Sequence, residues 1–400
     1  MKRKIWILAV FTAVVVSCGI EDLDVRPDTD REDIWFGPGV NAGDSGREVC
    51  YVTAFDYPED YDWRTDKEKG SVKCSLVVFA DGVPMMKVPV GDRYEVSSDP
   101  DMHRMLGGHI YTDYSTDSET VIKRDGKTLI RYPGREMICG MLADEENVYT
   151  LGHPRQGEGF TYRKNGEILL ERSSGRSFGR LHYDRDSICF AFAEPVLSQG
   201  DTVERYYHCT NGRVSQAALR EDIRKVWDII SCNGEICWIA SVTGIARPVL
   251  YHNGSLSAMI LPEDSRPLAF NMLCEGDQLY VEGMFTSPEI SLASAFWFRP
   301  GHCVSFDDGY LSASHCVSGG SVNCVFNPLD DTCPGLIYRN GEESTMPLGY
   351  AVMGNRCTAV AGGMLHIGLS SVDGDRPAIW RDGVTEVLDV CGYIASVSSE

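Results

Sequence analysis

The stretch that decides the fold is RPAIWRDG, residues 376–383. It closely resembles RPVLYHNG, residues 247–254, which begins 129 residues earlier. Each stretch reads as a short apolar strand that runs into an Asp-Gly or Asn-Gly pair. Such a pair favours a two-residue hairpin turn, because both central residues need a positive φ, which Asn, Asp and Gly tolerate best. The two stretches therefore predict two copies of one β-hairpin.

The same hairpin recurs through the chain. An apolar strand ends at a turn glycine in eight places: Gly82, Gly126, Gly166, Gly212, Gly254, Gly301, Gly341 and Gly383. The spacings are 44, 40, 46, 42, 47, 40 and 42 residues, and the residue before the glycine is Asn or Asp in seven of the eight copies. A period of this length is typical of β-propellers and is longer than that of the shorter solenoid repeats.

Each repeat contains the same order of strands. In the third repeat, turns separate four apolar segments: residues 137–142, 148–151, 160–162 and 168–170. Four strands joined as a meander form one propeller blade. The sequence therefore predicts an all-β fold, an eight-bladed β-propeller of four-stranded blades.

The ends of the repeat array predict how the ring closes. Residues 49–54 read as the second strand of the first blade, and no first strand precedes them. Residues 390–395 remain after the last repeat and resemble residues 137–142, a first strand. We therefore expect the C-terminal strand to complete the first blade, which leaves no free sheet edge. Residues 47–400 would then form one propeller domain.

The N-terminal residues predict export and a lipid anchor. Residues 1–4 are basic and residues 5–17 are apolar, which is the pattern of a signal peptide. VVSCG, residues 15–19, resembles a bacterial lipobox, and that resemblance implies that Cys18 is lipidated. The alternative is an ordinary secretory signal with an incidental cysteine. Residues 19–46 are acidic and contain Gly and Pro, so they predict a flexible tether.

Composition limits the class of protein and of partner. Of the 400 residues, 43 % are hydrophobic and 10 % aromatic, enough for a large core and too many for a disordered chain. The net charge of −21 repels nucleic acid and anionic lipid headgroups. We therefore expect no nucleic-acid partner, contact with the membrane only through the lipid anchor, and a monomer.

The meander sorts the connections between two faces of the propeller. The Asn-Gly turns and the turns between first and second strands lie on one face, which we name the turn face. The loops between second and third strands and the links between blades lie on the other, which we name the loop face. The loop-face connections are longer and more varied, and binding residues concentrate on such loops. We therefore expect a ligand to bind on the loop face.

The most distinctive loop-face segment is FDYPEDYDWRTD, residues 55–66. Its aromatic rings could stack on sugars while its carboxylates accept hydrogen bonds from hydroxyl groups. The candidate ligand-binding residues are Asp56, Tyr57, Tyr61, Asp62 and Trp63, with Tyr114, Arg247, Asp373 and Arg376 from other loops. Two alternatives stay open. The aromatic rings could pack on their own blade, or the carboxylates could hold Ca²⁺.

Cysteines and catalytic motifs are less informative. Fifteen cysteines are present, and most of the fourteen besides Cys18 lie in apolar strand segments, where Cys acts as a small hydrophobe. A disulfide between Cys232 and Cys237 fits the spacing of a tight hairpin. No Cys-x-x-Cys pair and none of the common catalytic motifs occurs. The sequence thus predicts no metal and no cofactor, and it identifies no catalytic residue.

As a whole the chain resembles the propeller lipoproteins of Bacteroidetes-type bacteria, a family of unassigned function. The resemblance lies in residues 15–18, in the acidic Glu21-Asp22 that follows, and in the repeated aromatic-x-[Asn/Asp]-Gly motif. It implies an outer-membrane lipoprotein exposed on the cell surface, with a periplasm-facing orientation as the alternative. We expect a non-catalytic module that binds glycan or protein. The alternatives are a polysaccharide-degrading enzyme, either lyase or glycoside hydrolase, and a scaffold for outer-membrane assembly.

Overall fold

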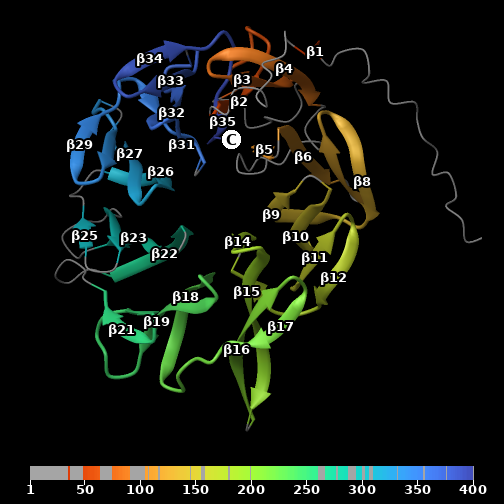
Figure 1. The fold of residues 1–400 in the computed structure, drawn as a ribbon, viewed down its shortest axis with the longest axis vertical. Helices are drawn as coiled ribbons and strands as arrows, with labels where there is room; N and C mark the ends of the chain where they lie inside the picture. Colours follow the sequence, from red (N-terminus) through yellow and green to blue (C-terminus); the bar gives the residue numbers. More distant parts are fainter. Residues whose placement is uncertain are drawn as a thin grey trace, which may run out of the picture.

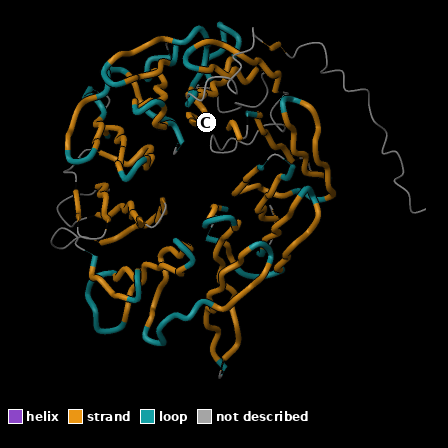
Figure 2. Tube along the Cα trace, in the orientation of Figure 1, coloured by secondary structure: helices purple, strands orange, loops and turns teal. Residues whose placement is uncertain are grey.

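The computed structural model of the chain describes residues 35–36 and 48–399, except for gaps at 64–73, 91–103, 107, 116–117, 145, 155–157, 179–180, 199, 260–265, 276–277, 287–293, 300–301, 306–309, 331, 355 and 375. Every helix or strand in this part of the chain is a β-strand (Figure 2). A search of the same residues finds no helix that could cross a membrane. The all-β prediction is therefore confirmed.

The strands form antiparallel sheets that follow one another around a ring (Figure 1). One sheet has the order β1 (Trp35–Phe36), β4 (Val83–Val90), β3 (Cys74–Ala80), β2 (Cys50–Asp56), β35 (Ile394–Ser399). The next contains β5 (Arg104–Leu106), β6 (His109–Ser115), β7 (Glu119–Arg124) and β8 (Lys127–Pro133). It is followed by β9 (Glu136–Ala143), β10 (Val148–Pro154), β11 (Phe160–Lys164) and β12 (Glu167–Arg172). The next contains β13 (Arg176–Ser177), β14 (His182–Asp184), β15 (Ser187–Ser198), β16 (Asp201–Thr210) and β17 (Arg213–Gln216).

The second half of the chain repeats the pattern. One sheet contains β18 (Ile223–Cys232), β19 (Glu235–Val242), β20 (Val249–His252) and β21 (Ser255–Ala258). Then come β22 (Arg266–Glu275), β23 (Gln278–Thr286), β24 (Ser294–Arg299) and β25 (His302–Ser305). They are followed by β26 (Tyr310–Ser318), β27 (Ser321–Pro328), β28 (Leu336–Arg339) and β29 (Glu342–Thr345). The last contains β30 (Tyr350–Ala351), β31 (Thr358–Ala361), β32 (Met364–Ser371), β33 (Ala378–Arg381) and β34 (Val384–Val387). This is the β-propeller of four-stranded blades that the repeat predicts.

The Asn-Gly and Asp-Gly turns adopt the expected backbone. Seven of the eight predicted turns have positive φ at both central residues, as at Asn165 (51°) and Gly166 (84°), and the eighth, at Gly301, lies outside the described residues. The Asn165 Oδ1 atom also accepts a hydrogen bond of 2.8 Å from Val148 N, while Asn165 N donates to Val148 O. The same reciprocal pair is made by Asp81, Asp125, Asn211, Asn340 and Asp382.

The C-terminal strand closes the ring as predicted. Strand β35 pairs with β2, so that Val52 lies opposite Val397 and completes the inner side of the first sheet. The strand begins at Ile394 rather than at residue 390, four residues later than predicted. The preceding residues follow the end of β2 closely instead: a Cβ atom at Gly392 would lie 2.2 Å from Phe55 O.

Part of the segment predicted to be a flexible tether forms a strand that pairs with β4. Trp35 and Phe36 form β1, which lies opposite Lys87 and Met86 on the outer edge of the first sheet. The remainder of residues 19–46 and the predicted lipidation site Cys18 lie outside the described residues.

Neighbouring sheets are joined by buried side chains and by one disulfide in the described part of the chain. Ile239 and Leu250 pack in one cluster with Met272 from the next sheet. Cys232 and Cys274, which lie on the first strands of these two sheets, form the disulfide. The predicted bridge between Cys232 and Cys237 is therefore wrong, because the cysteine pairs across the gap between two blades and not within one hairpin.

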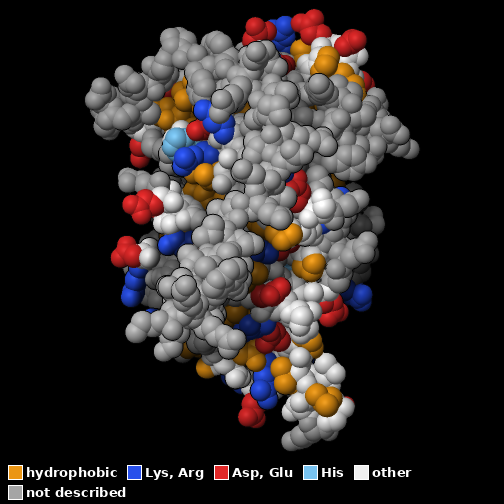
Figure 3. Space-filling view, turned by 90° about the vertical axis from the view of Figure 1, so that its right-hand side faces the viewer, with side chains coloured by type: hydrophobic (Ala, Val, Ile, Leu, Met, Phe, Trp, Pro, Cys, Tyr) orange, Lys and Arg blue, Asp and Glu red, His pale blue; other side chains and the backbone are white. Residues whose placement is uncertain are grey.

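The outer surface of the ring is mixed in character. Seen from the side, acidic and basic side chains are interspersed over the coloured part of the surface (Figure 3). Apolar side chains gather at the lower end, where Figure 1 shows the β15–β16 hairpin extending from the ring. Leu197 and Val203 on this hairpin are 75 % and 41 % exposed.

Candidate functional site

The aromatic residues of the predicted binding loop belong to the core. Tyr57 and Trp63 are only 8 % and 5 % exposed. The ring centroid of Trp63 lies 4.9 Å from that of Tyr393, and the ring of Tyr57 lies 5.2 Å from that of Tyr61. Burying these rings against their own blade removes apolar surface from water and stabilises the fold. The prediction that Tyr57 and Trp63 stack on a ligand is therefore corrected: neither ring has a free face.

The acidic residues of the same loop differ from one another. One carboxylate oxygen of Asp56 lies 2.7 Å from Lys87 Nζ, and the other accepts a hydrogen bond of 3.0 Å from Cys391 N. Asp56 therefore holds the link that precedes β35. Asp62 is exposed, and Tyr61 is half-buried. Among the described residues of this loop, residues 58–60 and Asp62 face solvent.

The other predicted residues lie far apart. Arg247 is exposed between β19 and β20, whereas Asp373 and Arg376 are exposed between β32 and β33. Two other sheets separate these connections around the ring (Figure 1). Arg376 forms an ion pair with Asp389. The side chain of Tyr114 lies outside the described part of the chain. The structure therefore separates Arg247 from Asp373 and Arg376.

Two cavities instead border the inner strands of the ring. The larger, of about 300 Å³, is lined by residues from β5, β26, β31 and β35, which are the innermost strands of successive sheets (Figure 1). The smaller, of about 240 Å³, is lined by residues from β22, β23 and β26. Strand β26 therefore contributes to both cavities.

A nearly buried contact between a carboxylate and an imidazole connects the two cavities. Glu282 on β23 lines the smaller cavity, and its Oε2 atom lies 3.1 Å from Nδ1 of His315 on β26, which lines the larger one. The two side chains are 15 % and 7 % exposed. Charged side chains are costly to withdraw from water, and a buried pair seldom stabilises a fold more than apolar residues would. A pair that borders a cavity is therefore a candidate for a role in function.

Arg356 adds a permanent positive charge to the larger cavity, which it lines together with His315. Arg356 lies in the turn that precedes β31, and β31 is joined to β26, which carries His315, by a buried hydrogen bond of 2.9 Å between Ser314 Oγ and Thr358 Oγ1. Ser314 Oγ also accepts a hydrogen bond of 3.0 Å from Cys357 N. These contacts link the residues next to His315 and Arg356, so the two cavity side chains are held beside each other.

A second buried ion pair shows a different arrangement. Glu136 and Arg163 lie 2.8 Å apart and are 11 % and 10 % exposed. The other Glu136 oxygen accepts a hydrogen bond of 3.2 Å from Tyr132, whose ring lies 4.1 Å from the Arg163 guanidinium carbon. Burial, followed by the charge of Glu136, raises the pKa of Tyr132 well above its ordinary value. Glu136, Arg163 and Tyr132 thus contact one another between two blades. They line neither of the two cavities, so we assign them a structural role.

Sequence reasoning missed Glu282, His315 and Arg356. Glu282 and His315 lie on two successive sheets, Arg356 lies in the turn before β31 of the next sheet, and the three residues share no local motif. One signal was present: Glu282 interrupts an otherwise apolar strand, LYVEGMF. A charged residue in the second strand of a blade indicates contact with a neighbour or with a cavity.

Comparisons with known proteins give no family. No family model matches the chain, and no curated protein matches it. Among solved structures, a puromycin-hydrolyzing peptidase from Mycobacterium tuberculosis is similar, with a TM-score of 0.47 and 8 % identity over 74 % of this chain and 53 % of that one. The acylaminoacyl peptidase of Pyrococcus horikoshii gives 0.44 and 11 % over 88 % and 63 %. The chain thus spans about half to two thirds of the length of these peptidases.

The polysaccharide lyase Uly1 is also similar, with a TM-score of 0.43 and 9 % identity over 76 % of this chain and 91 % of that one. At such low scores and identities, neither the fold nor an activity follows from these similarities. The fold assignment rests on the sheet topology alone.

Proposed function

We propose that the chain is a surface-anchored lipoprotein whose eight-bladed propeller binds an acidic glycan through the cavities at its centre. The observation that carries the proposal is the position of Glu282, His315 and Arg356 beside these cavities. The sequence placed the ligand on the outer loops of the loop face. The burial of Tyr57 and Trp63 moves the proposed site to the inner strands.

The chemistry of the larger cavity favours an anionic sugar. The protein carries a net charge of −21, yet Arg356 and His315 line this cavity. A guanidinium binds a carboxylate through paired, charge-assisted hydrogen bonds. Ser396 and Ser398, which line the same cavity, supply groups of the kind that bind sugar hydroxyls. A cavity of about 300 Å³ has the size of a small-molecule site, so it suits the end of a saccharide chain better than it suits a protein ligand.

The test is calorimetric titration with acidic and neutral oligosaccharides of matched length. We expect binding of the acidic series only, and Arg356→Ala should weaken it by about tenfold to hundredfold, because a hydrogen bond to a charged group contributes about 1.5–3 kcal/mol. Arg247→Ala is the matched control, since it removes an exposed arginine from the loop face. Equal affinity for R356A and the wild-type protein would contradict the proposal.

A second candidate is an enzyme that degrades an acidic polysaccharide, and the Glu282–His315 contact favours it. A carboxylate that holds an imidazole fixes its orientation and stabilises its protonated form, so that the imidazole can act as a general base. Arg356 would neutralise the carboxylate of the bound uronate sugar, next to the sugar carbon that loses its proton to His315. Incubation with a uronate polymer separates the candidates. An enzyme accumulates unsaturated ends, and His315→Ala abolishes them, whereas a binding module releases no product.

Anchoring and blade number complete the proposal. The lipobox-like residues 15–19 support lipidation at Cys18, and the acidic Glu21-Asp22 supports surface exposure. Cys18→Ala should release the protein from membranes, and protease added to intact cells should digest the wild-type protein if it is surface-exposed.

The eight separate sheets among the described strands support eight blades.

A further inference from the structure

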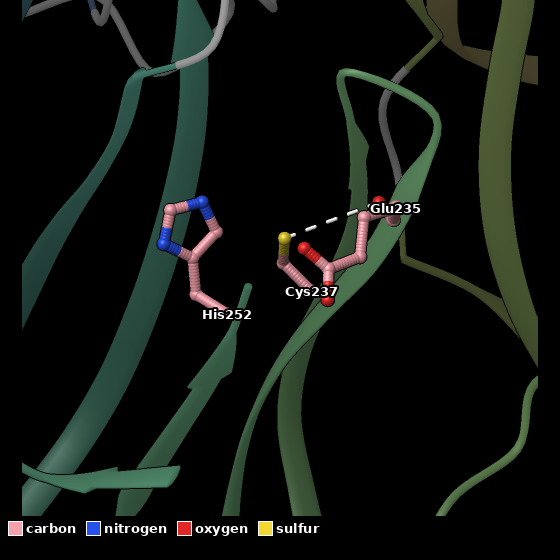
Figure 4. Close-up of side chains that lie close together, drawn as sticks. All are labelled: Glu235, Cys237 and His252. Atoms are coloured by element: carbon pink, nitrogen blue, oxygen red, sulfur yellow. Dashed lines mark hydrogen bonds between the residues drawn. The ribbon is translucent and has the colours of Figure 1, made fainter. Parts of the chain in front are cut away.

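A compact group of possible metal ligands lies away from the central cavities. Glu235 and Cys237 are two residues apart on β19, so their side chains lie on the same face of the strand. His252 ends the neighbouring strand β20, one residue beyond the Trp238–Tyr251 pair of the ladder. Figure 4 shows the thiol, the imidazole and the carboxylate grouped beside the hairpin. One ligand atom from each residue lies within 4.8 Å of the other two.

These three groups suit zinc. Zinc binds thiolate, imidazole and carboxylate at about 2.0–2.3 Å in a tetrahedral arrangement. Such bond lengths place tetrahedral ligand atoms about 3.3–3.8 Å apart, so the three atoms, which lie within 4.8 Å of one another, move closer together when the ion binds. The side chains of Glu235 and His252 are half-buried, whereas Cys237 is fully buried. A metal ion could therefore reach the group from the side of Glu235 and His252, with water as the fourth ligand.

The turn beside this group departs from the repeat. In the other described hairpins the Asn or Asp side chain accepts a hydrogen bond from the second strand. Here Glu235 reaches the turn instead, and its two oxygens accept hydrogen bonds of 2.8 Å from Asn253 N and Gly254 N. The Asn253 amide nitrogen lies 3.5 Å from His252 Nδ1. The carboxylate and the imidazole are thus both held by the turn, as metal ligands commonly are by outer contacts.

The disulfide leaves the cysteine free to bind a metal. Cys232 lies opposite Glu235 at the end of the same hairpin and would be the nearest partner for Cys237 in sequence. It is bonded to Cys274, so Cys237 remains a thiol. Oxidation that forms the structural disulfide therefore does not consume the proposed ligand.

We propose that Glu235, Cys237 and His252 form a zinc site on the β18–β21 sheet. Cys237 supplies thiolate sulfur, His252 an imidazole nitrogen and Glu235 a carboxylate oxygen. The ion would link the second and third strands of the blade at its turn. Because zinc binds the thiolate, binding releases the thiol proton of Cys237 into solvent.

The test uses the full chain prepared without reductant, so that the disulfide stays intact. Co²⁺ is titrated in place of Zn²⁺, and its visible spectrum reports tetrahedral geometry and sulfur ligation. We expect one equivalent to bind with a thiolate-to-cobalt absorption band and release of one proton, and excess Zn²⁺ to remove the spectrum. Cys237→Ser should abolish the sulfur band, and His252→Ala should weaken binding by about tenfold or more.

Cys189→Ser is the matched control. Cys189 is a buried cysteine on β15 in an equivalent position, but Thr210 stands opposite it where His252 stands in the proposed site, and the Thr210 hydroxyl lies 3.8 Å from the thiol. This variant should bind Co²⁺ like the wild-type protein. If C237S fails to fold, the cobalt titration of H252A alone tests the site. A sulfur band that survives in H252A at unchanged affinity, or no tetrahedral spectrum in the wild-type protein, would overturn the proposal.

Discussion

At the scale of single residues, the repeated Asn or Asp does two things. Its backbone adopts the positive φ that the two-residue turn requires, as at Asn165 with 51°. Its side chain also accepts a hydrogen bond from the start of the second strand, as from Val148 N. Glycine could satisfy the first requirement but not the second. The Asn-Gly and Asp-Gly pairs alone predict the turn, whereas the hydrogen bond from the second strand to the side chain could be seen only in the structure.

Asn165→Gly isolates the side-chain bond. The variant keeps a residue that tolerates positive φ but leaves Val148 N without its partner, so we expect a loss of about 1–2 kcal/mol in the free energy of unfolding. Asn253→Gly is the control, because no hydrogen bond is formed from β19 N–H to its side chain and Glu235 supports that turn instead. Urea denaturation measures both variants. Equal losses would show that backbone freedom, and not the side-chain bond, is responsible.

His208 predicts a pH dependence of stability. Burial, followed by the charge of His182, lowers the pKa of His208 from 6.5 to about 4. The unfolded chain therefore takes up this proton at a higher pH than the folded one. The associated stability is fully present above pH 6.5 and is lost as the pH falls towards 4, with a total of up to about 3 kcal/mol. Urea denaturation between these pH values should show a weaker pH dependence in His208→Asn. Parallel curves for the two proteins would exclude His208 as the source.

At the scale of elements, the aromatic loop shows where sequence reasoning failed. The motif FDYPEDYDWRTD contains the residue types of a sugar-binding surface, and composition cannot tell an exposed ring from a buried one. What decides is the partner, Tyr393, which lies more than 300 residues away and is brought alongside only when β35 joins β2. The alternative in which the rings pack on their own blade was correct.

Trp63→Ala should therefore act on stability. Removing a ring that is 5 % exposed and packs on Tyr393 leaves a cavity, with an expected cost of about 3 kcal/mol. Asp62→Ala, at the neighbouring exposed position, should change stability by less than about 0.5 kcal/mol. Thermal and urea denaturation of both variants provide the measurement. A tryptophan variant as stable as D62A would mean that the ring is not part of the core.

Contacts between elements on different blades were the least predictable. Strand pairs within a blade follow from apolar segments and turn residues that are near in sequence. The Glu282–His315 contact joins a second strand to the first strand of the next blade, 33 positions later, whereas the Cys232–Cys274 disulfide joins equivalent ends of the first strands of two successive blades, 42 positions apart. Once the period is known, such pairs can be sought by comparing residues one repeat apart, because neighbouring blades place them side by side.

At the scale of the whole molecule, the first and last parts of the chain are joined in one sheet. Ile394 and Ala395 are fully buried and Val397 is 4 % exposed, so β35 supplies core as well as hydrogen bonds. Without it, β2 would become a free sheet edge at the centre of the ring, and the apolar side chains of two adjoining blades would lose their cover. The ring is therefore expected to unfold as one cooperative unit.

Two truncations of the same sheet test this closure. Removing residues 394–400 deletes the inner strand, and we expect loss of the cooperative transition and aggregation, because the cost exceeds about 5 kcal/mol, the lower end of a domain's total stability. Removing residues 19–46 deletes β1, whose described pairs, those of Trp35 and Phe36, lie at the outer edge of the sheet, so we expect the transition to remain close to that of the full domain. Calorimetry and size-exclusion chromatography compare the two. If both truncated proteins melt like the parent, the ring does not depend on β35, and its stability must come from each blade separately.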